Sequence, residues 1–203
     1  MGNFPVLTTA CLPPAGYIKS ILQHTGGVID EKEHFIKQTI RNHYEILSAN
    51  GVLKLTVPVI HHAAKMPVHE VKISYAEPWQ RLHLNAIKSA YGRSPFFPHY
   101  FPELEKIISE SPVLLTVLNR QLLQWVFHCM KIAPSISFTQ NYLPTENDYR
   151  HASEKHSDYF LIMVNNIRYS QVFADRFPFI KNLSIIDLIF NCGNWSGKIL
   201  MES

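Results

Sequence analysis

The sequence predicts a single α/β domain over residues 1–203, in which a mixed sheet is flanked by helices. Three patterns predict this class. Residues 6–10 and 28–30 are β-prone and enclose a helix signal that begins at Pro13-Pro14 and ends near residue 23, which makes a strand–helix–strand unit. Asn50-Gly51 between the β-prone runs 44–47 and 52–59 predicts a hairpin. Residues 79–132 carry apolar side chains at helical spacing.

The remaining elements follow from local patterns. Alternation of Val, Ile and Tyr with polar residues predicts a half-buried strand over residues 68–75. Helices are expected over residues 79–91, 101–109 and 113–132, and Pro134 ends the last of them. A strand over 135–139 comes next, then a long polar loop over 141–158. Residues 159–165 fit a strand or a short helix, and 183–191 fit a helix capped by Gly193.

Composition limits the classes of function. Hydrophobic residues make up 46% of the chain, so a sizeable core is expected, and the net charge of +3 with scattered basic residues gives no reason to expect a nucleic-acid partner. The three cysteines are widely spaced and give no disulfide framework or metal motif, so we expect no metal. No phosphate-loop or dinucleotide pattern is visible, and we expect no cofactor. No signal peptide or transmembrane segment is apparent, which predicts a cytoplasmic protein.

One polar block runs from Lys37 to His43 and contains Thr39 and Arg41. In an extended conformation these four side chains would share one face, because side chains alternate along a strand. Such a face suits a phosphate, a carboxylate or a nucleotide sugar. The alternative is a solvated strand face whose cations form local ion pairs with nearby acidic residues such as Glu33.

A second polar block lies near the C-terminus. Asp187 interrupts an apolar helix pattern, and a buried carboxylate is costly unless it is paired. Asp187 is therefore expected either to accept hydrogen bonds or to meet a cation, for which Arg41 and Lys37 are candidates. Asn191 lies one turn later on the same helix face, and Tyr169 and Gln171 would share a strand face. A structural clamp and a substrate contact both explain this block.

Two further positions are candidates for chemistry. Trp79 and His83 are neighbours on a predicted helix, so His83 is a candidate general base beside an aromatic platform, or one half of a packed core pair. Tyr91 begins an aromatic turn that would line a sugar site or cover the core. Cys11 precedes a helix and is either a nucleophile, which requires a histidine within hydrogen-bond reach, or a small packing residue.

The order of these motifs resembles the WbqC-like family, and especially a branch found in Bacteroides-type bacteria. The similar stretches are Leu12-Pro13-Pro14 with Tyr17, Lys37 to Asn42, Asn50-Gly51, Val57-Pro58-Val59, Trp79 with His83, Ala90-Tyr91, Ser94 to Phe97, Tyr169 with Gln171 and Phe173, and Leu183 to Leu188 with Asn191 and Gly193. Many members open with His-Gln-Pro-Asn-Tyr-Leu-Pro-Trp, whereas residues 7–14 read Leu-Thr-Thr-Ala-Cys-Leu-Pro-Pro, and His43 replaces a second Arg.

The resemblance implies a role in O-antigen or other surface-polysaccharide biosynthesis, with glycine transfer to an amino sugar as the suggested activity. We therefore expect a transferase that moves an acyl or aminoacyl group to a small-molecule substrate, a nucleotide-activated amino sugar. Lys37, Arg41 and His43 would bind its charged group, Tyr91, Tyr169, Gln171 and Asn191 would line the sugar, and His83 and Asp187 would be catalytic. The alternative is a non-catalytic binding or scaffold protein that contacts the polysaccharide assembly enzymes. An enzyme would bring Arg41, His83, Tyr169 and Asp187 to one pocket.

Overall fold

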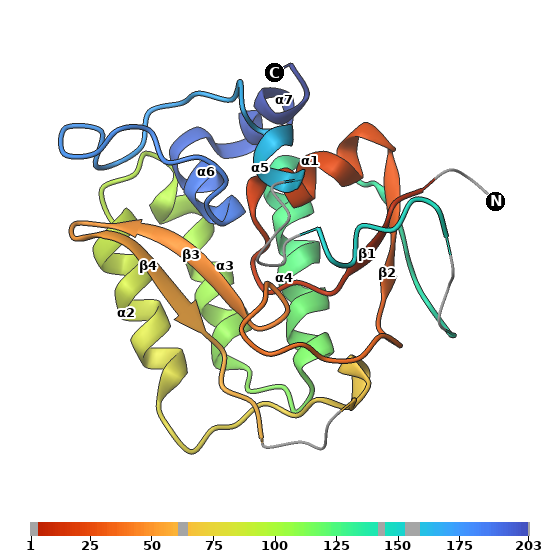
Figure 1. Cartoon of the computed structure of the whole chain (residues 1–203). Helices are drawn as coiled ribbons and strands as arrows, with labels where there is room; N and C mark the ends of the chain where they lie inside the picture. The colour runs from red at the N-terminus through yellow and green to blue at the C-terminus, as the bar shows by residue number, and fades with distance from the viewer. Residues whose placement is uncertain (1–3, 61–64, 142–144, 153–158, 203) are drawn as a thin grey trace.

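The computed structural model describes residues 4–60, 65–141, 145–152 and 159–202. Its first unit is the predicted strand–helix–strand motif: β1 (Val6–Thr8), α1 (Ala15–Gln23) and β2 (Gly26–Asp30). The two strands pair in parallel, and β5 (Ser135–Phe138) adds a third parallel strand beside β2. All three strands therefore end at the same edge of the sheet, which matters for the site below (Figure 1).

The predicted hairpin is present. β3 (His43–Ser48) and β4 (Gly51–Thr56) pair antiparallel, with Ser48 opposite Gly51 across the tight turn. Gly51 has φ +103°, a conformation that favours glycine because a Cβ would be strained there. The parallel and antiparallel strands expected for a mixed α/β fold are both confirmed, and they form a three-stranded and a two-stranded sheet.

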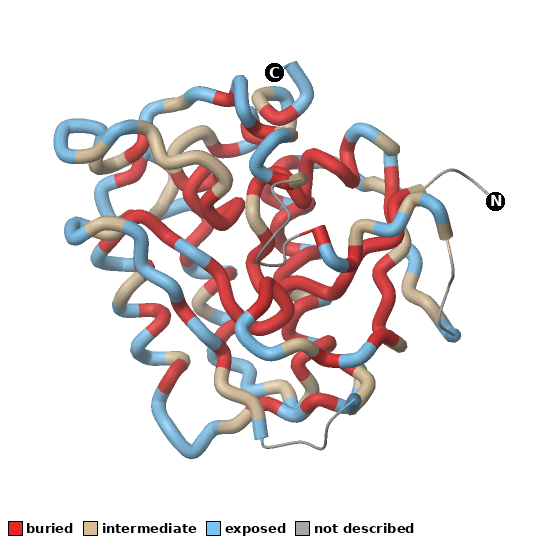
Figure 2. The backbone as a smooth tube through the Cα atoms, viewed as in Figure 1, coloured by how far each residue is buried: buried red, intermediate tan, exposed pale blue. Residues whose placement is uncertain are grey.

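Helices form the rest of the core. The long helices are α2 (Trp79–Tyr91), α3 (Phe97–Ser109) and α4 (Leu115–Met130), and the shorter ones are α5 (Tyr159–Met163), α6 (Ile185–Cys192) and α7 (Ser196–Met201), with single 3-10 turns η1 (Val68–Glu70) and η2 (Gly193–Trp195). α4 lies in the middle and packs against α3 and α6 (Figure 1). Buried residues concentrate in α1, α6, β1 and β2, whereas α2 and β4 expose much of their outer faces (Figure 2).

The structure departs from the predicted elements at one segment and decides between alternatives at another. Residues 68–75 do not form a strand: they contain the 3-10 turn η1 and isolated bridges at Lys72 and Ile73. Pro67 has no N–H to donate, and Val68 and Val71 are buried by the turn instead of by a pleated face. Residues 159–165 begin with helix α5, the helical alternative. Within the expected loop 141–158, residues 142–144 and 153–158 lie outside the described part of the chain.

Among the described residues, no helix is both long and apolar enough to cross a membrane.

Gly16 allows α1 and α5 to approach closely. A Cβ built on Gly16 would lie 2.1 Å from the carbonyl oxygen of Phe160, which is far inside van der Waals contact. The Gly16 N–H also donates to Asn182 Oδ1 over 3.0 Å. The backbone of α1 therefore packs directly on α5 and on the segment that leads into α6.

Gly16→Ala should lower the free energy of unfolding by about 1–3 kcal/mol, because the backbone of α5 must shift to make room. Urea denaturation measures this loss. Gly27→Ala is the matched control, since a Cβ there would meet its nearest atom at an ordinary 3.4 Å. An equal loss in both variants would contradict the close packing of α1 on α5.

Candidate functional site

The carboxyl edge of the parallel sheet gathers polar residues that are buried. Thr8 ends β1, Asp30 ends β2, and Glu31 and Glu33 follow directly; all four are at most 6% exposed. In open parallel sheets, ligands bind outside the carboxyl ends of the strands. Burying charges is costly, so their concentration at this edge makes it a candidate functional site.

The first ion pair at this edge joins Glu33 and Arg41. The Arg41 guanidinium is fully buried and donates to Glu33 twice, with Nε to Oε1 at 3.0 Å and Nη2 to Oε2 at 2.7 Å. Arg41 Nη1 also donates to Thr39 Oγ1 over 3.0 Å, and Thr8 Oγ1 donates to the same Glu33 carboxylate. This geometry ties the segment after β2 to the end of β1.

The second ion pair involves Arg150, which is 1% exposed. Its Nη1 donates to Asp30 Oδ2 over 2.6 Å, and its remaining nitrogens bind Asp148. Hydrogen bonding to Arg150 lowers the pKa of Asp148. Thr139 Oγ1, just after β5, donates to Asp30 Oδ1 over 2.8 Å. Arg41 Nη2 contacts the Arg150 carbonyl at 3.4 Å, so the two ion pairs meet and form one structure, which we call the edge network.

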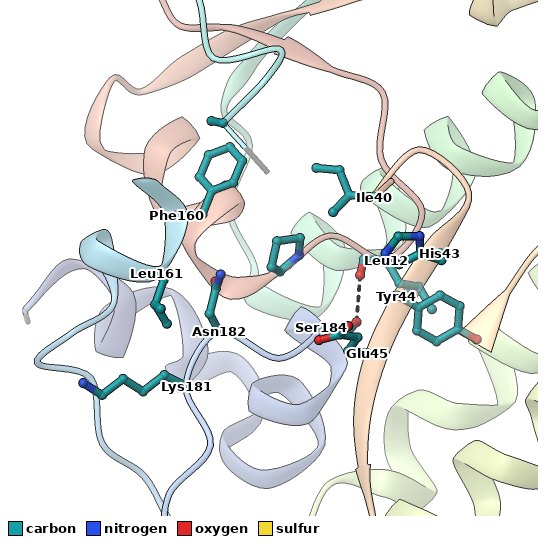
Figure 3. A pocket seen from close by; sticks show the side chains of 12 residues that line it. Leu12, Ile40, His43, Tyr44, Glu45, Phe160, Leu161, Lys181, Asn182 and Ser184 are labelled. Atoms are coloured by element: carbon teal, nitrogen blue, oxygen red, sulfur yellow. Dashed lines mark hydrogen bonds between the residues drawn. The ribbon is translucent and has the colours of Figure 1, made fainter. Parts of the chain in front are cut away.

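A cavity of about 340 Å³ lies beside the edge network, and we call it the His43 cavity (Figure 3). It draws on the loop after β1, the start of β3, α5 and the segment before α6. Phe160 and Leu161 of α5 stand on the opposite side of the cavity from His43 and Tyr44 (Figure 3). The complete lining is Leu12, Pro14, Ile40, His43, Tyr44, Glu45, Ala152, Phe160, Leu161, Lys181, Asn182 and Ser184.

His43 is the most informative residue of this cavity. Its side chain is 8% exposed, and among the described residues its Nδ1 has no hydrogen-bond partner. Burial, together with the smaller effect of the nearby Lys54 charge, lowers the pKa of His43 to about 4. The imidazole is therefore neutral at pH 7 and offers an unused nitrogen to a ligand.

The other polar groups of the His43 cavity have structural partners. Ser184 Oγ donates to the Leu12 carbonyl over 2.8 Å, the hydrogen bond drawn in Figure 3. Asn182 Oδ1 accepts a hydrogen bond from the Gly16 N–H at the start of α1, and Lys181 Nζ donates to Asn165 Oδ1 over 2.9 Å. Lys181 is only half-buried, so its ammonium lies at the rim, opposite in charge to the exposed Glu45.

A second cavity, of about 460 Å³, borders the same network and is lined by Lys32, Glu33, His34, Ile36, Arg150 and His151. Both cavities take residues from the same two stretches, 36–43 and 150–152. Among the described residues, no group of three or more His, Cys, Asp or Glu side chains is arranged to hold a metal ion.

The predicted extended face over Lys37, Thr39, Arg41 and His43 is wrong. Residues 37–42 form turns, with Gln38 at φ 59°, so the four side chains do not share a face. Lys37 is exposed, Arg41 is bound to Glu33, and of these four polar residues His43 is the one that lines the His43 cavity. The Arg41–Glu33 ion pair is the local pairing with acidic residues that the sequence allowed as the alternative to a ligand-binding face.

His83 occupies a packed position between α2 and the hairpin. Its Nδ1 is 3.1 Å from the Tyr44 hydroxyl, and its ring lies edge-on to Trp79 with 5.1 Å between centroids. Burial lowers the pKa of His83 to about 4, partly opposed by a hydrogen bond to the Thr56 backbone. With both polar contacts made inside the protein, His83 fits the packed core pair better than a general base.

Asp187 accepts hydrogen bonds from neutral groups, which confirms one of the two expectations for it. The alternative, a cationic partner, is wrong for both candidates: Arg41 is paired with Glu33, and Lys37 is exposed. Asp187 Oδ2 accepts from the Tyr169 hydroxyl over 2.5 Å and from Gln171 Nε2 over 3.0 Å. Burial raises the pKa of Asp187, against the effect of these hydrogen bonds. Gln171 also exchanges two hydrogen bonds of 2.9 Å with the backbone of Ile180. This arrangement clamps residues 169–180 to α6.

The remaining predicted residues have structural contacts as well. Tyr91 is fully buried, and its hydroxyl accepts from the Leu47 N–H over 3.3 Å. Asn191 Nδ2 donates to the Asp187 carbonyl over 2.7 Å. Burial raises the pKa of the Cys11 thiol to about 12, and within the described part of the chain no hydrogen bond joins Cys11 to a histidine. The packing role of Cys11 is therefore the better description.

Arg41, His83, Tyr169 and Asp187 do not converge on one pocket. Tyr169 and Asp187 meet at α6, Arg41 lies in the edge network, and His83 lies under the hairpin. Sequence reasoning assigned no role to Asp30, Glu33 or Arg150 beyond local ion pairing. The sequence did contain a signal for Asp30 and Glu33, because Asp30 ends the predicted strand 28–30 and Glu33 lies three residues later. Ligands bind at such carboxyl ends of parallel strands.

Comparison with known proteins gives one match. A family model described as the WbqC-like protein family matches residues 9–158, about three quarters of the chain. This range contains His43 and the edge network apart from Thr8, whereas Tyr169, Gln171, Asp187 and Asn191 lie beyond it. No curated protein and no solved structure matches the chain.

Arg41→Ala should lower the free energy of unfolding by about 3–5 kcal/mol, because it leaves the Glu33 carboxylate buried without its partner. Chemical denaturation measures the loss, and Arg41→Met combined with Glu33→Met should recover much of it. Lys54→Ala is the control, since the exposed Lys54–Glu45 pair, 3.8 Å apart, is expected to contribute less than about 1 kcal/mol. A stable Arg41→Ala protein would mean that the buried pair is not structural.

The two buried histidines predict a loss of stability in mild acid. Their folded pKa values of about 4 lie below the ordinary histidine value of 6.5, so the unfolded chain binds more protons between these values. The free energy of unfolding should fall as pH drops from 6.5 toward 4, and the fall should be smaller in a His43→Asn, His83→Asn double variant. Imidazole NMR signals that titrate near pH 6.5 for both residues would contradict their burial.

Proposed function

Because the chain belongs to the WbqC-like protein family, we propose that it is a transferase of surface-polysaccharide biosynthesis. In this proposal it moves an acyl or aminoacyl group, such as glycyl, to the amine of an activated amino sugar. The sugar binds in the His43 cavity. Membership of the family supports the transfer chemistry. The cavity beside the carboxyl edge of the sheet supports the location of the sugar.

One observation carries the location: His43, a buried neutral imidazole whose Nδ1 has no hydrogen-bond partner among the described residues, lines a cavity of about 340 Å³. Small-molecule sites usually measure about 300–1,000 Å³ and combine apolar walls with a few fixed polar groups. Here Phe160 and Leu161 supply an apolar wall, and His43 supplies the fixed polar group. A single sugar ring with one substituent fits such a space.

The roles follow from charge and position. A neutral His43 can hydrogen-bond an amine or hydroxyl of the sugar, whereas a positive charge on its ring is opposed by burial and by Lys54. His43 is therefore a group that orients the amine for attack on the acyl carbonyl. Lys181 at the rim is placed to meet negative charge on the donor or on the activating group.

A non-catalytic binding or scaffold protein is the second candidate. Two observations favour it: the four residues expected at one catalytic pocket are dispersed, and the outer strand β4 exposes apolar side chains, with Val52 50% and Leu53 37% exposed. A partner among the polysaccharide assembly enzymes would cover such residues. Binding of an amino sugar without any change in its mass would favour this candidate.

Thermal unfolding in a panel of nucleotide-activated sugars tests the proposal. A ligand at about 100 times its dissociation constant adds about 2.7 kcal/mol, which raises the melting temperature by about 5–10 °C for a chain of this size. The shift should require a free amine on the sugar and should be lost in His43→Asn. His99→Asn, an exposed histidine outside the cavity, is the control. Mass spectrometry of the sugar after incubation with acyl donors then separates transferase from scaffold.

An equal shift for His43→Asn and the unchanged protein would contradict the location of the site. A shift that does not depend on the sugar amine would contradict the proposed acceptor.

A further inference from the structure

A cavity of about 440 Å³ lies apart from the edge network, where the end of α2 meets the segment before α6. Its lining comes from the hairpin turn, α2 and the turn that follows it, residues 170–176 and α6. The residues are Ala49, Ser89, Ala90, Arg93, Ser94, Pro95, Ser170, Gln171, Val172, Phe173, Asp175, Arg176 and Asn191. No role proposed above uses this cavity.

Two guanidinium groups come to this cavity from distant parts of the sequence. Arg93 follows α2, and within the described residues no ion pair engages it. Arg176 has one weak ion pair, with Nε 4.0 Å from Asp175 Oδ2, and that carboxylate is 76% exposed. The charged lining residues are these three, so the cavity carries one net positive charge.

Hydroxyl groups line the same cavity as the two cations. They are those of Ser89, Ser94 and Ser170. Ser94 is 4% exposed, and its Oγ has no hydrogen-bond partner among the described residues. A buried hydroxyl without a partner is unfavourable, so a ligand atom that accepts its hydrogen would remove the cost.

The amide side chains at this cavity hold its walls. The side-chain amide of Gln171 forms hydrogen bonds with the Ile180 backbone and with Asp187. Asn191 donates a hydrogen bond to the backbone of α6. The carbonyl of Lys88 at the end of α2, which would repel an anion, accepts the Gly92 N–H over 2.9 Å. The groups left for a ligand are therefore two guanidinium groups and three hydroxyl groups, which can all donate, and the exposed Asp175 carboxylate, which only accepts and lies beside Arg176.

We propose that the Arg93–Arg176 cavity binds a phosphoryl group. Several donors that converge from separate segments suit a phosphoryl group, which presents more acceptor oxygens than a carboxylate, and paired guanidinium groups are the side chains most adapted to it. The inference goes beyond the proposed function, because this cavity borders the hairpin turn at the end of β3 opposite His43 and shares no lining residue with the His43 cavity. The phosphoryl group belongs either to a soluble nucleotide or sugar phosphate, or to a lipid-linked sugar.

Binding of inorganic pyrophosphate to the full chain, measured by calorimetry, tests this site without any sugar or turnover. Arg93→Gln and Arg176→Gln should each weaken binding by about tenfold, the effect of removing one charge-assisted hydrogen bond. Ser94→Ala should weaken it by a smaller factor. Arg81→Gln is the matched control, since it removes the same charge from an exposed position of α2 outside this cavity. Because the two arginines are exposed, unfolding midpoints should stay unchanged.

Equal weakening by Arg81→Gln would show general charge attraction and overturn the site, as would the absence of pyrophosphate binding. His43→Asn should leave pyrophosphate binding intact. If it does while sugar transfer is never found, the phosphoryl site stands and the transferase proposal falls. Co-sedimentation with neutral vesicles that do or do not contain a polyprenyl phosphate identifies the source. Binding that requires the phosphate lipid and Arg93 indicates a lipid-linked ligand, and binding to free pyrophosphate alone indicates a soluble one.

Discussion

The structure depends on the pairing of buried carboxylates with buried guanidinium groups at the carboxyl edge of the parallel sheet. Asp30 ends β2 and Glu33 lies three residues later, and without Arg150 and Arg41 each would be a buried carboxylate without a cationic partner. Breaking a buried pair costs about 3–5 kcal/mol, a large share of the stability of an ordinary domain. The pairs therefore hold the segments that contain residues 33–41 and 148–150 against the strand ends.

This constraint also determines what the site can do. Arg41 is already committed to Glu33 and Thr39, so the most obvious cation of the polar block is a structural group. His43, two residues later, lies at the start of β3 with an unused nitrogen. The edge network thus fixes the chain immediately before the group that we assign to ligand binding. The same relation holds at α6, where Asp187 and Gln171 anchor residues that lead to the Arg93–Arg176 cavity.

Much of the fold was predictable because its signals are local. Pro13-Pro14 begins α1, Asn50-Gly51 makes the hairpin turn, and apolar spacing marks α2 and α4. The strand predicted over residues 68–75 is absent because alternation of apolar and polar residues does not by itself provide a neighbouring strand. A 3-10 turn buries Val68 and Val71 equally well.

The site was less predictable because its partners are distant in sequence. Arg150 lies 120 residues from Asp30, and no local pattern connects them. His43 was selected as part of an extended face that does not exist, yet it reaches a cavity because β3 begins there. Tyr169, Gln171 and Asp187 were correctly grouped by their polarity near an apolar helix, but polarity does not distinguish a clamp from a substrate contact.

The most direct test of the central claim is to map ligand contacts by NMR. The protein, labelled with ¹⁵N, would be titrated with a nucleotide-activated amino sugar that raises its melting temperature. The account predicts that the largest amide shifts occur at His43, Tyr44 and residues 181–184, around the cavity beside the edge network. Shifts that are confined to α2 around His83, with none at His43, would contradict it.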